Sequence, residues 1–203
     1  MRGVDPAMPS KSLLRWQTEA RTHLDHIVSV HAAVAGAQPG QRAAAAQVNH
    51  AYAMLLSSHF QRFCRDLHTE VILYVCAEVP VPWVQPMLRA RLADGRKLDT
   101  GNPNPGNIGS DFKRFGLEIW PSMVALDART AGRKLKLEQL NRWRNAIAHQ
   151  DFAQAADLDL GGGRVDLRLS DVDGWRAACE QLATAMDAAL CVRIAGLAGA
   201  PPW

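Results

Sequence analysis

Three polar side chains that suit chemistry on a phosphodiester, Arg144, Asn145 and His149, lie within six consecutive positions. A histidine can take or give a proton near neutral pH, because its unperturbed pKa is about 6.5. An arginine stays charged, and its planar fork matches two phosphate oxygens. Asn145 is a candidate either to orient the imidazole or to contact the phosphate. The set fits RNA cleavage by 2′-hydroxyl attack, which needs proton transfer and positive charge but no metal.

The surrounding apolar residues predict how this segment lies on a helix. Leu140, Trp143 and Ile147 share one face and are expected to enter the core, whereas Asn145 and His149 share a stripe away from it. Arg144 lies about 140° from His149 around an ideal helix. Bringing both to one phosphate therefore requires the long arginine arm, a loosened helix end, or a second copy of the chain.

The positive charge of the chain is concentrated just before the motif. Six basic residues and a single acidic one, Glu138, lie between positions 129 and 144, a pattern that favours phosphate binding. We predict Arg133, Lys134, Lys136 and Arg142 as RNA-binding residues, and we expect neither a metal nor a cofactor. The predicted site residues are Arg144, Asn145 and His149.

With its flanking sequence, the motif resembles the HEPN superfamily, whose signature is an arginine, a polar residue and a histidine four to six positions on. Residues 51–67 are similar to the long second helix of the branch called RiboL-PSP-HEPN. The loop at 101–107 and Phe115-Gly116-Leu117 are also similar to that branch, so the resemblance covers roughly residues 45 to 155.

The resemblance implies a helical bundle that forms a homodimer, with the motif helices of two copies facing each other across a cleft. It implies a metal-independent endoribonuclease, of a kind that acts as a toxin or an anti-phage effector and can pair with an antitoxin protein. His149 would be the general acid or base and Arg144 would stabilise the transition state. Relatives whose antitoxins are nucleotidyltransferases carry a tyrosine two positions after the histidine. Asp151 stands there in this chain, which argues against that form of regulation.

Two other functions remain open from the sequence. One is a non-catalytic module of the same superfamily that binds nucleic acid or nucleotide, or that only dimerises. The other is a helical interaction protein without a nucleic-acid role, in which Arg144 is a surface residue and the helix dipole favours His149. The asparagines at 101–107 are expected to form turns, with substrate contact as the alternative.

Composition is that of a globular protein of one domain. The 203 residues are 48% hydrophobic and 21% charged, with a formal net charge of +3. The four cysteines form no CxxC pair, which favours buried free thiols and a reducing cytoplasm. No apolar run is long enough to span a membrane, and the first ten residues lack the apolar core of a secretory signal.

The periodicity predicts an all-α, HEPN-like helical bundle over residues 12–197, between a disordered or vector-derived leader at 1–11 and a tail at 198–203. Met8 is a candidate native start. Leu14 and Val30 are among the expected core residues. A short β-hairpin is expected at about 157–169, a loop at 99–107, and a cap at Ser170 or Asp171 for the last helix. Helices are expected at about 12–34, 42–78, 84–93, 108–115 and 131–151.

Overall fold

The computed structural model describes residues 8–152, 158–160, 164 and 166–203, and within these ranges the regular structure is helical, without a strand. The prediction of an all-α bundle is confirmed. The helices are α1 (Lys11–Arg15), a π-helical turn (Trp16–Ala20), α2 (Arg21–Val34), α3 (Pro39–Ala77), α4 (Val84–Ala93), α5 (Lys97–Thr100), α6 (Pro105–Phe112), a 3-10 turn (Lys113–Phe115), α7 (Ile119–Leu126), α8 (Thr130–His149) and α9 (Leu169–Ala198).

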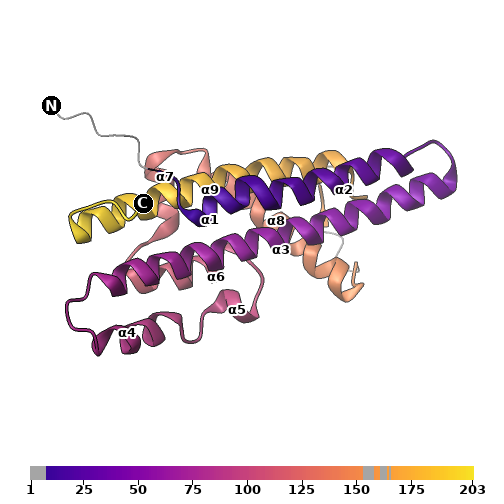
Figure 1. Ribbon diagram of the computed structural model, residues 1–203. Helices are drawn as coiled ribbons and strands as arrows, with labels where there is room; N and C mark the ends of the chain where they lie inside the picture. Colours follow the sequence, from indigo (N-terminus) through magenta and orange to yellow (C-terminus); the bar gives the residue numbers. More distant parts are fainter. Residues whose placement is uncertain (1–7, 153–157, 161–163, 165) are drawn as a thin grey trace.

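The long helix α3 is the element around which the others pack. It begins at Pro39, which suits the first helical position because its missing N–H would have no partner there. Its predicted apolar stripe is buried, with Tyr52, Leu56, Phe60 and Leu67 each 0% exposed. Figure 1 shows α2 turning back alongside α3, while α8 and α9 also contact α3 and each other.

Helix α9 is the one described helix that is long and apolar enough, by length and composition, to cross a membrane. Its apolar residues Val172, Trp175, Leu182 and Met186 are buried within the bundle, where α9 contacts α3, α7 and α8. The buried side of α9 therefore forms part of the core of the bundle.

The first predicted helix is interrupted by one π-helical turn at Trp16–Ala20. Trp16 is buried there, with its ring 5.6 Å from that of Phe60 and 5.9 Å from that of Phe63. The prediction of Leu14 and Val30 as core residues is wrong, since they are 47% and 48% exposed. Leu13 and Leu24 are the leucines of this segment that are buried instead.

The loop expected at 99–107 is shorter in the structure, because α5 extends to Thr100 and α6 begins at Pro105. Each X-Pro step disfavours the α conformation only in the preceding residue, so a proline can itself open a helix. Asn104 caps α6 by accepting a hydrogen bond from the Asn107 N–H at 2.8 Å. Four residues, 101–104, remain irregular.

The hairpin predicted at about 157–169 falls partly on residues 157, 161–163 and 165, which lie outside the described residues. The described ones form no strand, although the Leu160 N–H donates to the Arg164 carbonyl at 2.9 Å. The cap of α9 is Arg168, not Ser170 or Asp171. Asp171 contributes from inside the helix by accepting a hydrogen bond from the Arg168 N–H at 2.9 Å.

The folded domain is wider than the predicted range of 12–197. Ser10 is buried and caps α1 through its hydroxyl, and its N–H donates to Asp187 at 3.3 Å. The Trp203 indole donates to the same carboxyl group at 3.2 Å. Both ends of the described chain therefore pack against α9. Of the leader predicted at 1–11, residues 1–7 lie outside the described residues.

Candidate functional site

The motif forms the last two turns of α8, and a Schellman closure ends the helix directly after His149. The Asp151 N–H donates to the Ala146 carbonyl at 3.0 Å, and the Gln150 N–H donates to that of Ile147 at 3.3 Å. Gln150 itself adopts a left-handed conformation with φ of 53°. The closure fixes the point at which the chain leaves the helix, and with it the position of His149.

Burial of the apolar side of the motif sets its rotation about the helix axis. Leu140, Trp143 and Ile147 are buried, as predicted, and the Trp143 indole donates to the Leu158 carbonyl at 3.2 Å. Asn145 and His149 are exposed. The side chains proposed for chemistry therefore lie on the outer surface of the bundle.

A chain of side-chain amides connects the motif to the 101–104 loop. The Asn145 Oδ1 accepts hydrogen bonds from Arg144 Nη1 at 3.3 Å and from Asn102 Nδ2 at 3.0 Å. The Asn102 Oδ1 in turn accepts from Asn104 Nδ2 at 2.7 Å, while the Asn104 Oδ1 caps Asn107. Arg144 and Asn145 are thus held together, with a loop residue as a third member.

Hydrogen bonds from α8 and α3 also fix the 101–104 loop to the bundle. The buried Asn141 of α8 donates to the Pro103 carbonyl at 3.2 Å, and Gln61 of α3 donates to the carbonyls of Leu98 and Gly101, both at 2.7 Å. Backbone carbonyls in a turn need such partners when they are partly buried. These bonds hold the loop against α8 at the level of the motif.

His149 stands apart from the amide chain. It is exposed, and within the part of the chain that the structure describes no hydrogen bond or ion pair holds its ring. Arg144 is half-buried and its guanidinium contacts Asn145 rather than His149. Within one copy of the protein, Arg144 is therefore hydrogen-bonded to Asn145, and His149 lies apart from both. The angle of about 140° between Arg144 and His149 around an ideal helix predicts this separation.

The four predicted RNA-binding residues lie on different sides of α8. Arg142 is exposed about 20° from His149 around the helix, whereas Lys136 lies about 180° from Asn145. Arg133 forms an ion pair with Asp127 at 2.8 Å, and the Lys134 amine lies 5.6 Å from the centre of the Trp120 ring. The basic stretch is therefore not one continuous surface facing the motif.

Arg133 and Lys136 instead line a hollow of about 260 Å³ between α8 and α9, together with Arg129. Asp127 bonds both arginines, since Arg129 Nε lies 3.0 Å from its Oδ1. These ion pairs hold the pKa of the Asp127 carboxyl well below its usual range. Part of the positive charge predicted for RNA is thus neutralised within the chain.

Sequence reasoning missed an aromatic pair at the end of the motif helix. Phe152 is 39% exposed and stacks on His50 of α3, with ring centres 5.7 Å apart, and both lie near Trp143. Burial lowers the pKa of His50, because it disfavours the charged form of the ring. Only the position of Phe152 just after the motif hinted at this pair, because His50 lies about 100 residues earlier in the chain.

Among the described residues, no group of three or more histidine, cysteine, aspartate or glutamate side chains that could hold a metal ion occurs. His68 is fully buried, its Nε2 lies 3.1 Å from the Asp111 carbonyl, and burial lowers its pKa to about 4. The His59 ring lies 5.2 Å from that of His23, and burial lowers its pKa too.

The thiols agree with the prediction of free cysteines. Cys64, Cys76 and Cys179 are buried and Cys191 is half-buried. Burial raises the pKa of Cys64 and of Cys179, so both remain protonated and unreactive.

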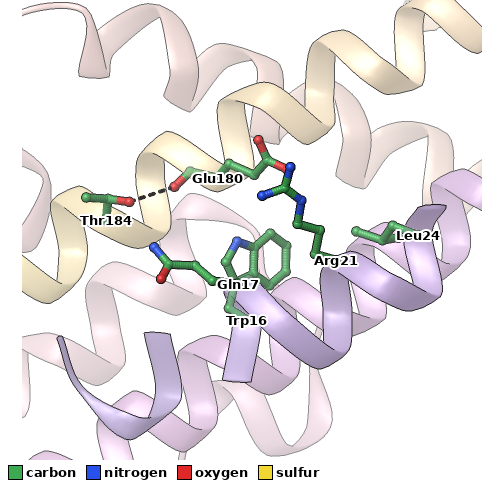
Figure 2. Close-up of a pocket in the computed structure, with 6 residues that line it drawn as sticks. All are labelled: Trp16, Gln17, Arg21, Leu24, Glu180 and Thr184. Carbon is green, nitrogen blue, oxygen red and sulfur yellow. Dashed lines mark hydrogen bonds between the residues drawn. The ribbon is translucent and has the colours of Figure 1, made fainter. Parts of the chain in front are cut away.

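A separate hollow of about 270 Å³ lies between the π-helical turn and α9, and Figure 2 shows the side chains that line it. Trp16 and Leu24 line it on the apolar side, and Arg21 and Glu180 bring opposite charges to it. None of its lining residues comes from α8, so it is not part of the motif site.

Comparison with known proteins leaves the chain without an assigned relative: no family model, no curated protein and no solved structure matches it.

Proposed function

We propose that this protein is a metal-independent endoribonuclease of HEPN type that works in the cytoplasm as a homodimer. The observation that carries the proposal is the pairing of Arg144 with Asn145 on an exposed helix end that also presents His149. In the proposed reaction the RNA 2′-oxygen gives up its proton and attacks phosphorus, and the bond from phosphorus to the 5′-oxygen breaks as that oxygen takes up a proton. The products are a 2′,3′-cyclic phosphate and a 5′-hydroxyl end.

Each side chain has a defined task in this reaction. His149 transfers a proton, since imidazole is the side chain that most often serves as a general acid or base. Arg144 stabilises the charge that develops on the phosphate oxygens. Asn145 binds the phosphate next to Arg144, and Arg142 holds the RNA backbone on the same side of the helix as His149. The family resemblance adds a role as a toxin or anti-phage effector, with an antitoxin protein as partner.

A second copy of the chain completes the site in this proposal. Arg144 and His149 point about 140° apart on one helix, and Arg144 bonds Asn145 instead. Two α8 helices that face each other across a two-fold axis would place the arginine of one copy near the histidine of the other.

The alternative is a non-catalytic module that binds RNA through the same surface. His149 has no hydrogen-bond or ion-pair partner among the described residues, which favours this alternative, because a general base is normally oriented by a second group.

Cleavage of a mixed-sequence RNA in EDTA tests the proposal, with wild type compared with His149→Ala. His26→Ala is the matched control, because His26 is also an exposed helical histidine but lies on α2. We expect cutting by wild type and His26→Ala, cyclic-phosphate ends, and no cutting by His149→Ala.

Equal cutting by all three proteins would refute the role of His149. No cutting by any, with RNA binding that weakens as salt rises, would support the binding module. Absence of both would point to a protein without a nucleic-acid role.

A further inference from the structure

In the amide chain beside the motif, the NH₂ group of Asn104 donates to Asn102 and that of Asn102 donates to Asn145. This donor-to-acceptor direction is fixed at both ends by groups that can only donate. At one end the guanidinium of Arg144, which has no acceptor, points at the Asn145 Oδ1. At the other end the backbone N–H of Asn107 occupies the Asn104 Oδ1, so Asn104 can offer only its NH₂ group to Asn102. Turning the side-chain amide of Asn145 or of Asn104 by 180° would therefore break at least one of these hydrogen bonds.

Asn102, in the middle of the amide chain, follows the same donor-to-acceptor direction. Asn102 uses its Oδ1 to accept from Asn104, and its remaining NH₂ group donates to Asn145. The Asn145 oxygen thus receives two donors, and its own NH₂ group is left on the exposed side. No acceptor in the described part of the chain bonds that group.

We infer that Asn104, Asn102 and Asn145 form an amide relay, anchored at the start of α6, that presents the Asn145 NH₂ group as a donor to a phosphate oxygen. Asn102 is a positioning residue in this relay. The identity of the ligand as a phosphodiester rests on the proposed function, whereas the direction of the relay rests on the hydrogen bonds alone.

An anionic ligand fits this arrangement better than a neutral donor. The guanidinium of Arg144 and the NH₂ group of Asn145 are neighbours, because both groups belong to side chains joined at the Asn145 oxygen. Two adjacent donors, one of them charged, match the non-bridging oxygens of a phosphate. A ligand that itself offers hydrogens finds no acceptor here, since the one amide oxygen already has two partners.

Two substitutions of Asn102 separate positioning from mere support of the loop. Asn102→Asp keeps an acceptor for Asn104 but faces the Asn145 oxygen with another oxygen, so that Asn145 turns its NH₂ group inward. Asn102→Ala removes the contact but leaves Arg144 to hold the Asn145 oxygen. We expect kcat/KM for RNA cleavage to fall about tenfold in Asn102→Ala and about a hundredfold in Asn102→Asp.

Ser110→Asp is the matched control, because Ser110 is exposed on α6 and the change adds the same charge outside the relay. We expect its kcat/KM to stay near that of wild type. If Asn102 only supported the loop, aspartate would be the milder change, since it retains the bond to Asn104. That reversed order would overturn the inference.

Side-chain amide NMR gives a readout that does not need catalysis. The probe is a single-stranded DNA oligonucleotide, which offers phosphates but no 2′-hydroxyl. We expect the Asn145 NH₂ signals, assigned by their loss in Asn145→Ala, to shift on titration in wild type and not in Asn102→Asp.

An unmoved Asn145 signal in a wild-type protein that cleaves RNA would overturn the relay and leave the proposed nuclease intact. A moved signal in a wild-type protein that cleaves nothing would support the relay and reject the nuclease.

Discussion

Asp111 holds the segment that leads into the 101–104 loop, and replacing it should measurably destabilise the protein. Its carboxylate is 0% exposed and accepts hydrogen bonds from the backbone N–H groups of Lys97 and Leu98, both at 2.9 Å. Arg114 Nε lies 3.9 Å from the same group. The carboxylate thus fixes α5, whose end carries the Gly101 carbonyl that Gln61 binds.

The cost of Asp111→Asn follows from these bonds. Asparagine has nearly the same shape, keeps one oxygen for one N–H group and turns an NH₂ group toward the other. One charge-assisted hydrogen bond is lost and one buried N–H group loses its partner, which together cost about 3 kcal/mol. For a chain of this size that lowers Tm by roughly 6–12 °C.

Urea unfolding followed by circular dichroism measures the change, with Asp66→Asn as the control. Asp66 is also an aspartate bonded to arginine, at 2.7 Å from Arg15, but its side chain is 30% exposed. A pair of that kind contributes at most about 1 kcal/mol. Equal losses of unfolding free energy in the two variants would refute the reasoning.

Three further outcomes are expected. The pKa of His68 is depressed to about 4 by burial, so the unfolded chain binds a proton that the folded chain does not as pH falls below about 6.5. Unfolding free energy should therefore be greatest above pH 6.5 and fall by about 3 kcal/mol toward pH 4, and His68→Leu should remove this part of the slope in urea titrations between pH 5 and 6.5. Gln150→Gly relieves a left-handed conformation but loses the side-chain bond to Ile147 at 2.8 Å, so the two effects should offset and the free energy of unfolding should change by no more than about 1 kcal/mol. A loss above about 2 kcal/mol in urea unfolding would contradict this. Arg142→Ala should weaken RNA binding and reduce the slope of log affinity against log salt by about 0.7, whereas Lys136→Ala should leave both unchanged. Equal effects of the two substitutions would contradict RNA binding on the side of α8 that carries His149.

Much of the fold was predictable because burial imposes regular spacing on the long helices. The stripe from Tyr52 to Leu67 and the inward set of Leu140, Trp143 and Ile147 appear in the structure as the periodicity indicates. Helix α4 has the predicted limits, Val84–Ala93, because prolines mark its start. Leu14 and Val30 were misplaced because hydrophobicity alone does not say which side of a helix meets a neighbour.

The candidate site was predictable only in the part that the geometry of a single helix determines. The i, i+4 spacing of Asn145 and His149 is a property of one helix, and both are exposed as expected. The bond from Asn102 to Asn145 joins positions 43 residues apart, and nothing in the sequence states which of the loop asparagines faces α8. The division of the basic residues was not predicted either, because it depends on the ion pair of Arg133 with Asp127 and on the contact of Lys134 with Trp120 of α7.

A mixing experiment tests whether the proposed site is shared between two copies. In a dimer that pairs the Arg144 of one chain with the His149 of the other, Arg144→Ala and His149→Ala homodimers are both inactive. A heterodimer of the two variants has one site with both defects and one site intact. Random exchange makes half of the dimers heterodimers, so the mixture should recover about one quarter of wild-type activity. If each site used both residues of a single chain, every site in the mixture would lack one group, and activity would stay at the level of the separate variants. Exchange is verified independently by a fluorescence label on each chain, so that absence of recovery with complete exchange would reject the shared site and require Arg144 to reach His149 within one helix.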